Sequence, residues 1–362
     1  TVRGSEVIET TSKTSYNGNY GLNASWTIYN GSKRLNTIKQ ERLNNQVANL
    51  DVETSENSIQ ESIAQIYIQI LYAAESVKVN ENTLQVSIAQ RDRGQELLNA
   101  GSIAKSDFAQ LEAQVSTDRY QLVTAQATLQ DYKLQLKQLL ELDGENEMNI
   151  YLPALSDENV LLPLPAKKDV YMSALTLRPE IEASKMNVEA SELGIDIAKA
   201  GYLPTISLSA GIGTNHTSGS DFTFGEQVKN GWNNSIGVSV SVPIFNNRQT
   251  KSAVQKAKLQ RETSLLSLLD EQKTLYKTIE GLWLDANSAQ QRYAAANEKL
   301  KSTQISYDLI SEQFDLGMKN TVELLTEKNN LLQAQQEQLQ AKYMAILNTQ
   351  LLKFYQGDKL AL

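Results

Sequence analysis

Apolar and polar residues alternate strictly over three short stretches of the chain. In the stretch 235–245 the large apolar side chains share one parity, while Ser and Gly occupy the other up to Ser241; the apolar residues are Ile236, Val238, Val240, Val242 and Ile244. The stretches 19–29 and 205–213 repeat the pattern, with Leu22, Trp26, Ile206 and Leu208 on the apolar side. Because strand side chains alternate between faces, each stretch predicts a strand with one apolar face and one small, polar face.

Two environments explain such strands. One is a soluble sandwich in which each strand is half-buried. The other is a transmembrane β-barrel, whose strands span about ten residues and alternate in the same way. Aromatic residues favour the barrel, since Tyr20 and Trp232 lie at one end of the strands and Tyr202 at the other. Residues 214–233 are polar and Gly-rich and predict a long outer loop, which contains the single histidine, His216.

Long helices are predicted between the strands. Apolar residues at positions 59, 63, 66, 70, 73 and 77 step by four and three, and a similar series from Leu265 to Phe314 is interrupted only at Gln272 and Thr303. This coiled-coil spacing predicts helices over 32–93 and 248–314. Turns near Gly101 and Gly317 should lead into returning helices over 106–140 and 321–355. A helix of sixty residues is roughly 90 Å long, which a compact enzyme does not accommodate.

The chain repeats itself with an offset of 216 residues. The motif IYNGS at 28–32 lies over IFNNR at 244–248, and Gly101 then lies over Gly317 without a gap. A strand end and a helix break that agree in this way predict an internal duplication. We expect a first repeat over 1–140, an equatorial linker and helix over 141–200, and a second repeat over 201–356.

Composition excludes several classes of function. The chain has 34 basic and 42 acidic residues without a basic stripe, which argues against a nucleic-acid partner. Cysteine is absent and His216 stands alone, so we expect neither a metal nor a cofactor. No run of 18 apolar residues predicts a transmembrane helix. The chain begins TVRGSEV, without an initiator Met or a signal peptide, and we expect it to be processed or truncated.

Residues 177–213 and the following VSVSVPIFNNRQTKSAVQKAKLQ resemble the TolC-like outer membrane efflux protein family. The shared motifs are Arg-Pro-Glu before a helix, Leu-Pro before a strand, Pro-Ile-Phe after one, and the turn sequences SIAKSDFAQLEA and NTVELLTEKNN. The resemblance, which covers nearly the whole chain, implies a mixed α/β membrane protein. Its homotrimer has a twelve-stranded β-barrel, four strands per subunit, continued by a coiled-coil α-helical barrel across the periplasm of a Gram-negative bacterium. Three of the four strands are expected here, because the repeat offset places the first one before Thr1.

The function implied by the resemblance is passive export. An inner-membrane transporter would deliver substrates through a periplasmic adaptor to this outer-membrane exit duct of a tripartite efflux or type I secretion system. The resemblance places the adaptor at the helix turns, with Gly101, Ser102, Gly317 and Met318. It implies a tip constriction that includes Phe314, Lys319, Glu323, Thr326, Ser106 and Asp107. Here Phe314 and Thr326 replace a tyrosine and an acid of the family, and Lys319 is expected to meet Ser106 or Asp107.

Other interpretations of these residues remain open. Gly101 also fits a left-handed helix cap, and Ser106 and Asp107 fit the start of a helix, so plain turn chemistry is an alternative to a gate. A structural coiled-coil scaffold explains the heptads but gives the strands no role. An enzyme is disfavoured, because no phosphate loop is present and the carboxylates lie on solvated heptad surfaces. On the duct hypothesis the apolar strand faces contact outer-membrane lipid.

Overall fold

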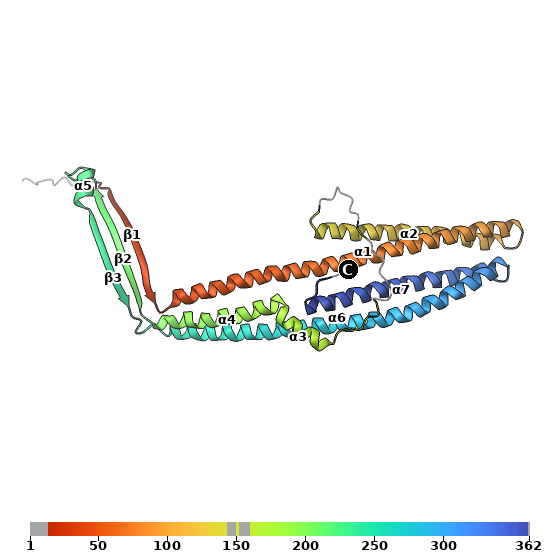
Figure 1. Ribbon diagram of the computed structural model, residues 1–362. Helices are drawn as coiled ribbons and strands as arrows, with labels where there is room; N and C mark the ends of the chain where they lie inside the picture. The colour runs from red at the N-terminus through yellow and green to blue at the C-terminus, as the bar shows by residue number, and fades with distance from the viewer. Residues whose placement is uncertain (1–13, 143–149, 152–159, 361–362) are drawn as a thin grey trace, which may run out of the picture. The chain divides into compact units, whose positions relative to one another are not determined.

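The computed structural model describes residues 14–142, 150–151 and 160–360. Within them the chain forms β1 (Asn17–Asn30), α1 (Lys33–Asn99), α2 (Lys105–Leu139), α3 (Lys167–Leu177), α4 (Pro179–Lys199), a 3₁₀ turn (Ala200–Tyr202), β2 (Thr205–Thr217), α5 (Phe224–Asn230), β3 (Asn233–Ser241), α6 (Gln249–Asp315) and α7 (Thr321–Gln356) (Figure 1). Residues 1–13 of the expected first repeat, and 143–149 and 152–159 of the expected linker, lie outside the described residues.

The chain folds as two compact units. One comprises Thr1–Gln46 and Met186–Leu266 and contains the sheet; the other comprises Val47–Lys185 and Ser267–Leu362 and contains the helical hairpins. Helices α1 and α6 each contribute to both units. The spatial units therefore combine parts of both sequence repeats.

The sheet is antiparallel and has the order β1-β2-β3. Strand β2 continues to Thr217, four residues beyond the expected end, because it pairs with β1 as far as Asn17. The expected outer loop over 214–233 is therefore partly wrong. It begins within a strand and also contains α5, whose start is capped by Thr223 and Glu226. Gln227 ties α5 to β2 by bonding the backbone N and O of Thr217 at 2.8 and 3.2 Å.

Strand β3 ends at Ser241, so the expected strand to residue 245 is too long. Its last partner is Thr205, the first residue of β2, because the chain before Thr205 is a 3₁₀ turn and not a strand. Pro243 also lacks the N–H that a ladder needs. The alternation of side chains outlasts the hydrogen bonding, which is why sequence alone overestimated the strand.

The hairpin unit has a core formed by several helices. One cluster joins α1, α6 and α7 around Ile68, Leu71 and Tyr293, and a second joins α3, α6 and α7 around Val170, Ile279 and Leu352. Every position of the predicted α6 seam that lies in this unit is buried or half-buried. Helix α1 also buries Ala64, Ile68 and Leu71 beside its predicted seam, because it contacts more than one neighbouring helix.

The Arg-Pro-Glu motif is a buried contact between helices of this unit. The Arg178 guanidinium lies 2.8 Å from a Glu180 oxygen and 3.4 Å from a Glu61 oxygen, and it stacks over the Tyr355 ring at 4.4 Å. Burial, followed by the charge of Glu61, raises the pKa of Tyr355 to about 12. Tyr355 therefore stays a neutral ring under the arginine at physiological pH.

Unusual backbone angles recur at the repeat offset. Gly31 and Ser32 have positive φ values, as do Asn247 and Arg248; the same holds for Gly101 and Gly317, and for Glu141 and Gly357. Helices α1 and α6 each have 67 residues. The two halves of the chain thus make their turns at corresponding positions.

Helix α1 continues through Gly94 to Asn99, whereas the sequence predicted an end at 93. Gly94 is buried against α2, and a Cβ there would lie 2.3 Å from Leu111 Cδ1. The glycine permits close approach of two helices and does not end one. In the sequence, a glycine at the end of a long apolar series is also what a helix end looks like. The packing role of Gly94 can be recognised only from its contact with Leu111.

We expect Gly94→Val to reduce the free energy of unfolding by about 1–3 kcal/mol, because the new side chain overpacks the contact with Leu111. Gly281→Ala in α6 is the matched control, since a Cβ there meets no atom within 4 Å. The control should be neutral or gain up to about 1 kcal/mol from the higher helix propensity of alanine. Guanidinium unfolding followed by circular dichroism measures both; equal stability of the two variants would contradict the packing role.

Candidate functional site

The sheet presents the predicted apolar face in register across its three strands. Trp26, Leu208 and Val238 lie side by side, and so do Ala24, Ala210 and Ile236. The side chains of Leu22, Trp26, Ile236, Val238 and Val240 are 60–83% exposed. No described residue of the sheet unit covers this face, so it needs an apolar environment from outside the chain.

The opposite face is small and polar. Ser25, Ser209 and Gly237 form one row, and Thr27, Ser207 and Ser239 form the next. Ser209 Oγ also donates to the Gly237 carbonyl at 3.2 Å. One face of the sheet therefore requires an apolar environment and the other face requires water.

The expected apolar row changes at the end of β1. A register shift between Thr27 and Tyr29 leaves Ile28 out of the pairing, and Tyr29 stands opposite Ile206. The bulge adds one residue to β1, so Tyr29 lies on the face where simple alternation would place Ile28. Tyr29, and not Ile28, thus continues the row of Trp26.

The two helix turns have the same geometry. Gly101 and Gly317 have φ values of 73° and 72°. At the first turn Gly101 N donates to Leu98 O and Ser102 N to Leu97 O; at the second, Gly317 N donates to Phe314 O and Met318 N to Gln313 O. This pair of bonds satisfies the last carbonyls of a helix and favours glycine at the left-handed position.

The α6–α7 turn exposes apolar side chains. Leu316, Met318 and Val322 are 69%, 71% and 57% exposed. Ser102 and Ser106 at the other turn are exposed as well. Asp107 accepts a bond from Ala104 N at 3.3 Å and so stabilises the start of α2, which is the plain turn chemistry considered above.

Lys319, in the turn just before α7, forms an ion pair with Glu323 in the first turn of that helix. Lys319 Nζ lies 2.7 Å from Glu323 Oε1, and Glu323 Oε2 accepts a bond from Asn320 N at 3.2 Å. The bond from Lys319, followed by that from the Asn320 backbone, lowers the pKa of Glu323. Lys319 therefore pairs with Glu323 in the structure, whereas the sequence led us to expect Ser106 or Asp107. Thr326 is exposed and donates to the Val322 carbonyl of its own helix.

Phe314 also differs from the expectation of a constriction residue. It is 3% exposed and packs with Leu111 and Leu324 in a small cluster between the two hairpins. An apolar ring suits this cluster better than a phenol would, because a hydroxyl needs a partner when buried. The side chain supports the turns from within the protein.

Sequence reasoning missed a buried polar cluster of Ser87, Asp118 and Lys328, which come from α1, α2 and α7. A signal was present. Leu324, Lys328 and Leu331 step by four and three, and Asp118 follows Leu111 and Val115 in the same way. A charge at a seam position is the pattern that marks a buried polar residue in a coiled coil.

In the part of the chain that the structure describes, no group of three or more His, Cys, Asp or Glu residues could hold a metal ion. In the same residues no helix has the length and apolar character needed to cross a membrane. His216 lies within β2, and not in a loop, with its ring centroid 5.1 Å from that of Phe224.

Comparison with known proteins shows the family to which the chain belongs. The family profile described as "Outer membrane efflux protein" matches residues 2–141 and 170–357. The chain belongs to the outer membrane efflux protein family. Membership locates it in the outer membrane and agrees with the resemblance noted in its motifs.

Individual members of the outer membrane efflux protein family are distant relatives. BepC of Brucella suis biovar 1 (strain 1330) is 24% identical, over 91% of this chain and 70% of its own length. TolC of Escherichia coli (strain K12) is 24% identical, over 83% of this chain and 62% of its own length. A crystal structure of CusC superposes with a TM-score of 0.81 at 18% identity, covering 96% of this chain and 83% of that one. The fold is therefore shared with CusC, and the chain spans about two thirds of the BepC and TolC sequences.

We expect Phe314→Ala to cost about 3–5 kcal/mol of unfolding free energy, because it empties the cluster between the hairpins. Leu316→Ala, two residues away and 69% exposed, is the matched control and should stay within about 0.5 kcal/mol of the parent. Guanidinium unfolding measures both. Similar midpoints for the two variants would return Phe314 to the surface of the tip.

Proposed function

We propose that this chain is the outer-membrane exit duct of a tripartite efflux or type I secretion system. It passively exports substrates that an inner-membrane transporter delivers through a periplasmic adaptor. The proposal is supported chiefly by the sheet, whose apolar and Ser/Gly faces are left uncovered by the described residues of its unit, in a family member whose helices reach 67 residues. A structural coiled-coil scaffold would not explain a sheet with an exposed apolar face.

The assembly in this proposal is a homotrimer with a twelve-stranded barrel and an α-helical tunnel. Strands β1 and β3 are the edges of the described sheet, and each has one side without a partner there. In hydrocarbon, unpaired backbone groups cost several kcal/mol each, so both edges need further strands. Closure into a barrel formed by four strands from each of three subunits supplies them.

The helix turns are the proposed contact with the adaptor. The turn at Gly101 and Ser102 is polar, whereas the turn at Gly317 and Met318 carries the exposed apolar residues Leu316 and Val322. Exposed apolar groups on a rigid turn suit a protein partner. The two turns would therefore bind unlike surfaces of the adaptor.

Relatives with similar sequences differ in their substrates. Their names refer to alkaline protease secretion, pyoverdine export and cation efflux. A duct discriminates only by the width and charge of its bore and has no fitted pocket for one substrate. The inner-membrane transporter would therefore determine which substrate is exported. At the tip, we propose that three copies of Glu323 favour cations, and that each copy is partly neutralised by its own Lys319.

The orientation of the sheet can be tested with single cysteines, since the chain has none of its own. Ile236, Val238 and Val240 should resist a membrane-impermeant maleimide in reconstituted trimers because they face lipid, while Ser235, Ser239 and Ser241 should react. Met318→Cys at the exposed turn serves as the positive control. Equal labelling of the Val and Ser positions would exclude the barrel.

The charge at the tip can be tested by single-channel recording in planar bilayers. Glu323→Gln should lower both cation selectivity and block by trivalent cations, and Lys319→Gln should raise them, because it removes the neutralising charge. Glu337→Gln is the matched control, since Glu337 also pairs with a lysine at 2.7 Å but lies further along α7. Unchanged block in Glu323→Gln would remove this residue from the conduction path.

A further inference from the structure

Ser87, Asp118 and Lys328 are three polar residues buried where α1, α2 and α7 meet. Their exposed fractions are 2%, 1% and 3%. Lys328 Nζ donates to Asp118 Oδ2 and to Ser87 Oγ, and the Ser87 hydroxyl donates to the same Asp118 oxygen. Each of the three helices thus contributes one group to a network that is closed to water.

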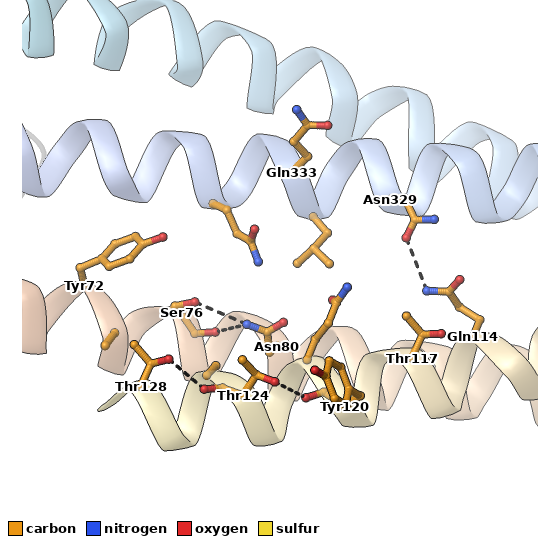
Figure 2. A pocket seen from close by; sticks show the side chains of 15 residues that line it. Tyr72, Ser76, Asn80, Gln114, Thr117, Tyr120, Thr124, Thr128, Asn329 and Gln333 are labelled. Carbon is orange, nitrogen blue, oxygen red and sulfur yellow. Dashed lines mark hydrogen bonds between the residues drawn. The ribbon is translucent and has the colours of Figure 1, made fainter. Parts of the chain in front are cut away.

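The second carboxylate oxygen extends the network. Asp118 Oδ1 accepts a bond from Gln114 Nε2 at 2.9 Å, and the same nitrogen lies 3.4 Å from Asn329 Oδ1 on α7; Figure 2 shows the Gln114–Asn329 bond. Both amides border a cavity of about 630 Å³ between the same three helices. All of its described lining residues are uncharged, so none of them could neutralise the Asp118 carboxylate in place of Lys328.

Such a network contributes more to specificity than to net stability. Burial lowers the pKa of Lys328, against the opposing effect of the hydrogen bond to Asp118. Desolvating two charges offsets most of their attraction, but removing one partner leaves a costly buried charge. A shift of α2 along α7 by a single residue would separate Asp118 from Lys328 and leave both charges buried without a partner. An apolar contact between two helices is non-directional and would permit the same shift at a lower cost.

The network lies close to the helix turns. Lys328 is about two helical turns into α7, and the cluster of Leu111, Phe314 and Leu324 is the other described core contact near that end of the hairpins. Figure 1 shows α2 and α7 running back from the turns beside α1 and α6. The register of α2 on α7 therefore determines how far apart the Gly101 and Gly317 turns lie.

We propose that Ser87, Asp118 and Lys328 form a buried latch that fixes the register of the α1–α2 hairpin on α7, and with it the spacing of the two turns. The latch rests on the proposed export function only in its consequence, which is that it holds the tip of the duct in its resting position. Lys328 is a positioning residue in this scheme and need not contact a substrate.

Spin labels at Ser102→Cys and Met318→Cys measure the spacing directly. The full chain has no other cysteine, and both sites are exposed. Labelled subunits are diluted into trimers with an excess of unlabelled chain, so that distances within one subunit dominate the double electron–electron resonance signal. The parent should give one narrow distance distribution.

Lys328→Met should broaden this distribution or shift its mean. The double variant Lys328→Met with Asp118→Leu leaves no buried charge; it should remain as stable as the parent and still show the broadening, because apolar groups do not fix a register. Lys299→Met is the matched control, since Lys299 also joins two helices by an ion pair at 2.7 Å but is exposed. Its distribution should equal that of the parent.

A parent-like distance distribution in the double variant would overturn the latch. This variant decides the question even where Lys328→Met fails to fold.

Planar-bilayer recordings distinguish failure of the latch from failure of the proposed duct function. Both latch variants should raise the resting conductance above that of the parent. Channels that conduct in every variant at unchanged spacing refute the latch alone. Broadened spacing in proteins that never conduct refutes the duct and supports the latch.

Discussion

The long helices of this protein depend on the helices that return beside them. A helix of 67 residues has no core of its own, and its apolar stripe is stable only where another helix covers it. The stripe of α6 is covered along the hairpin unit by α7, with help from α1 and α3. The chain must therefore reverse at defined points, and the left-handed glycines Gly101 and Gly317 define them. The position of each turn follows from the packing of the stripes behind it.

The sheet differs from the helices, because no described residue of its unit covers its apolar face. Trp26, Leu208 and Val238 form a continuous apolar row, while Ser25, Ser209 and Gly237 lie on the other side of the same backbone. A soluble sandwich would bury the first row under a second sheet, and the described sheet unit has only one. In the proposed barrel, hydrocarbon would cover the first row and water the second, while further strands would pair with the two edges.

Most of the secondary structure follows from periodicity, and the departures occur where another helix or strand decides. The seam from Leu265 to Phe314 could be predicted because its residues lie on one side of a single helix, which gives regular steps of three and four in the sequence. Gly94 was misread because its role is the approach of Leu111 from a different helix, and Val242 because its partner strand begins only at Thr205. The turn glycines were identified as candidate sites, but contacts within the tip were not. The sequence does not reveal that Lys319 pairs with Glu323 four residues away, or that Phe314 points into the core.

A comparison of two lysine–carboxylate pairs at α7 shows how burial changes the consequence of the same chemistry. Lys319 lies in the turn just before α7 and Glu323 in its first turn, so their pair joins no other helix to α7. Their side chains are 32% and 40% exposed, so water and salt screen the pair. Lys328 and Asp118 lie on different helices at 3% and 1% exposure, where no solvent can replace a lost partner. The exposed pair can change with ionic conditions while the hairpins stay where they are. The buried pair can change only if a hairpin moves, so any opening of the tip that shifts α2 along α7 must first break it.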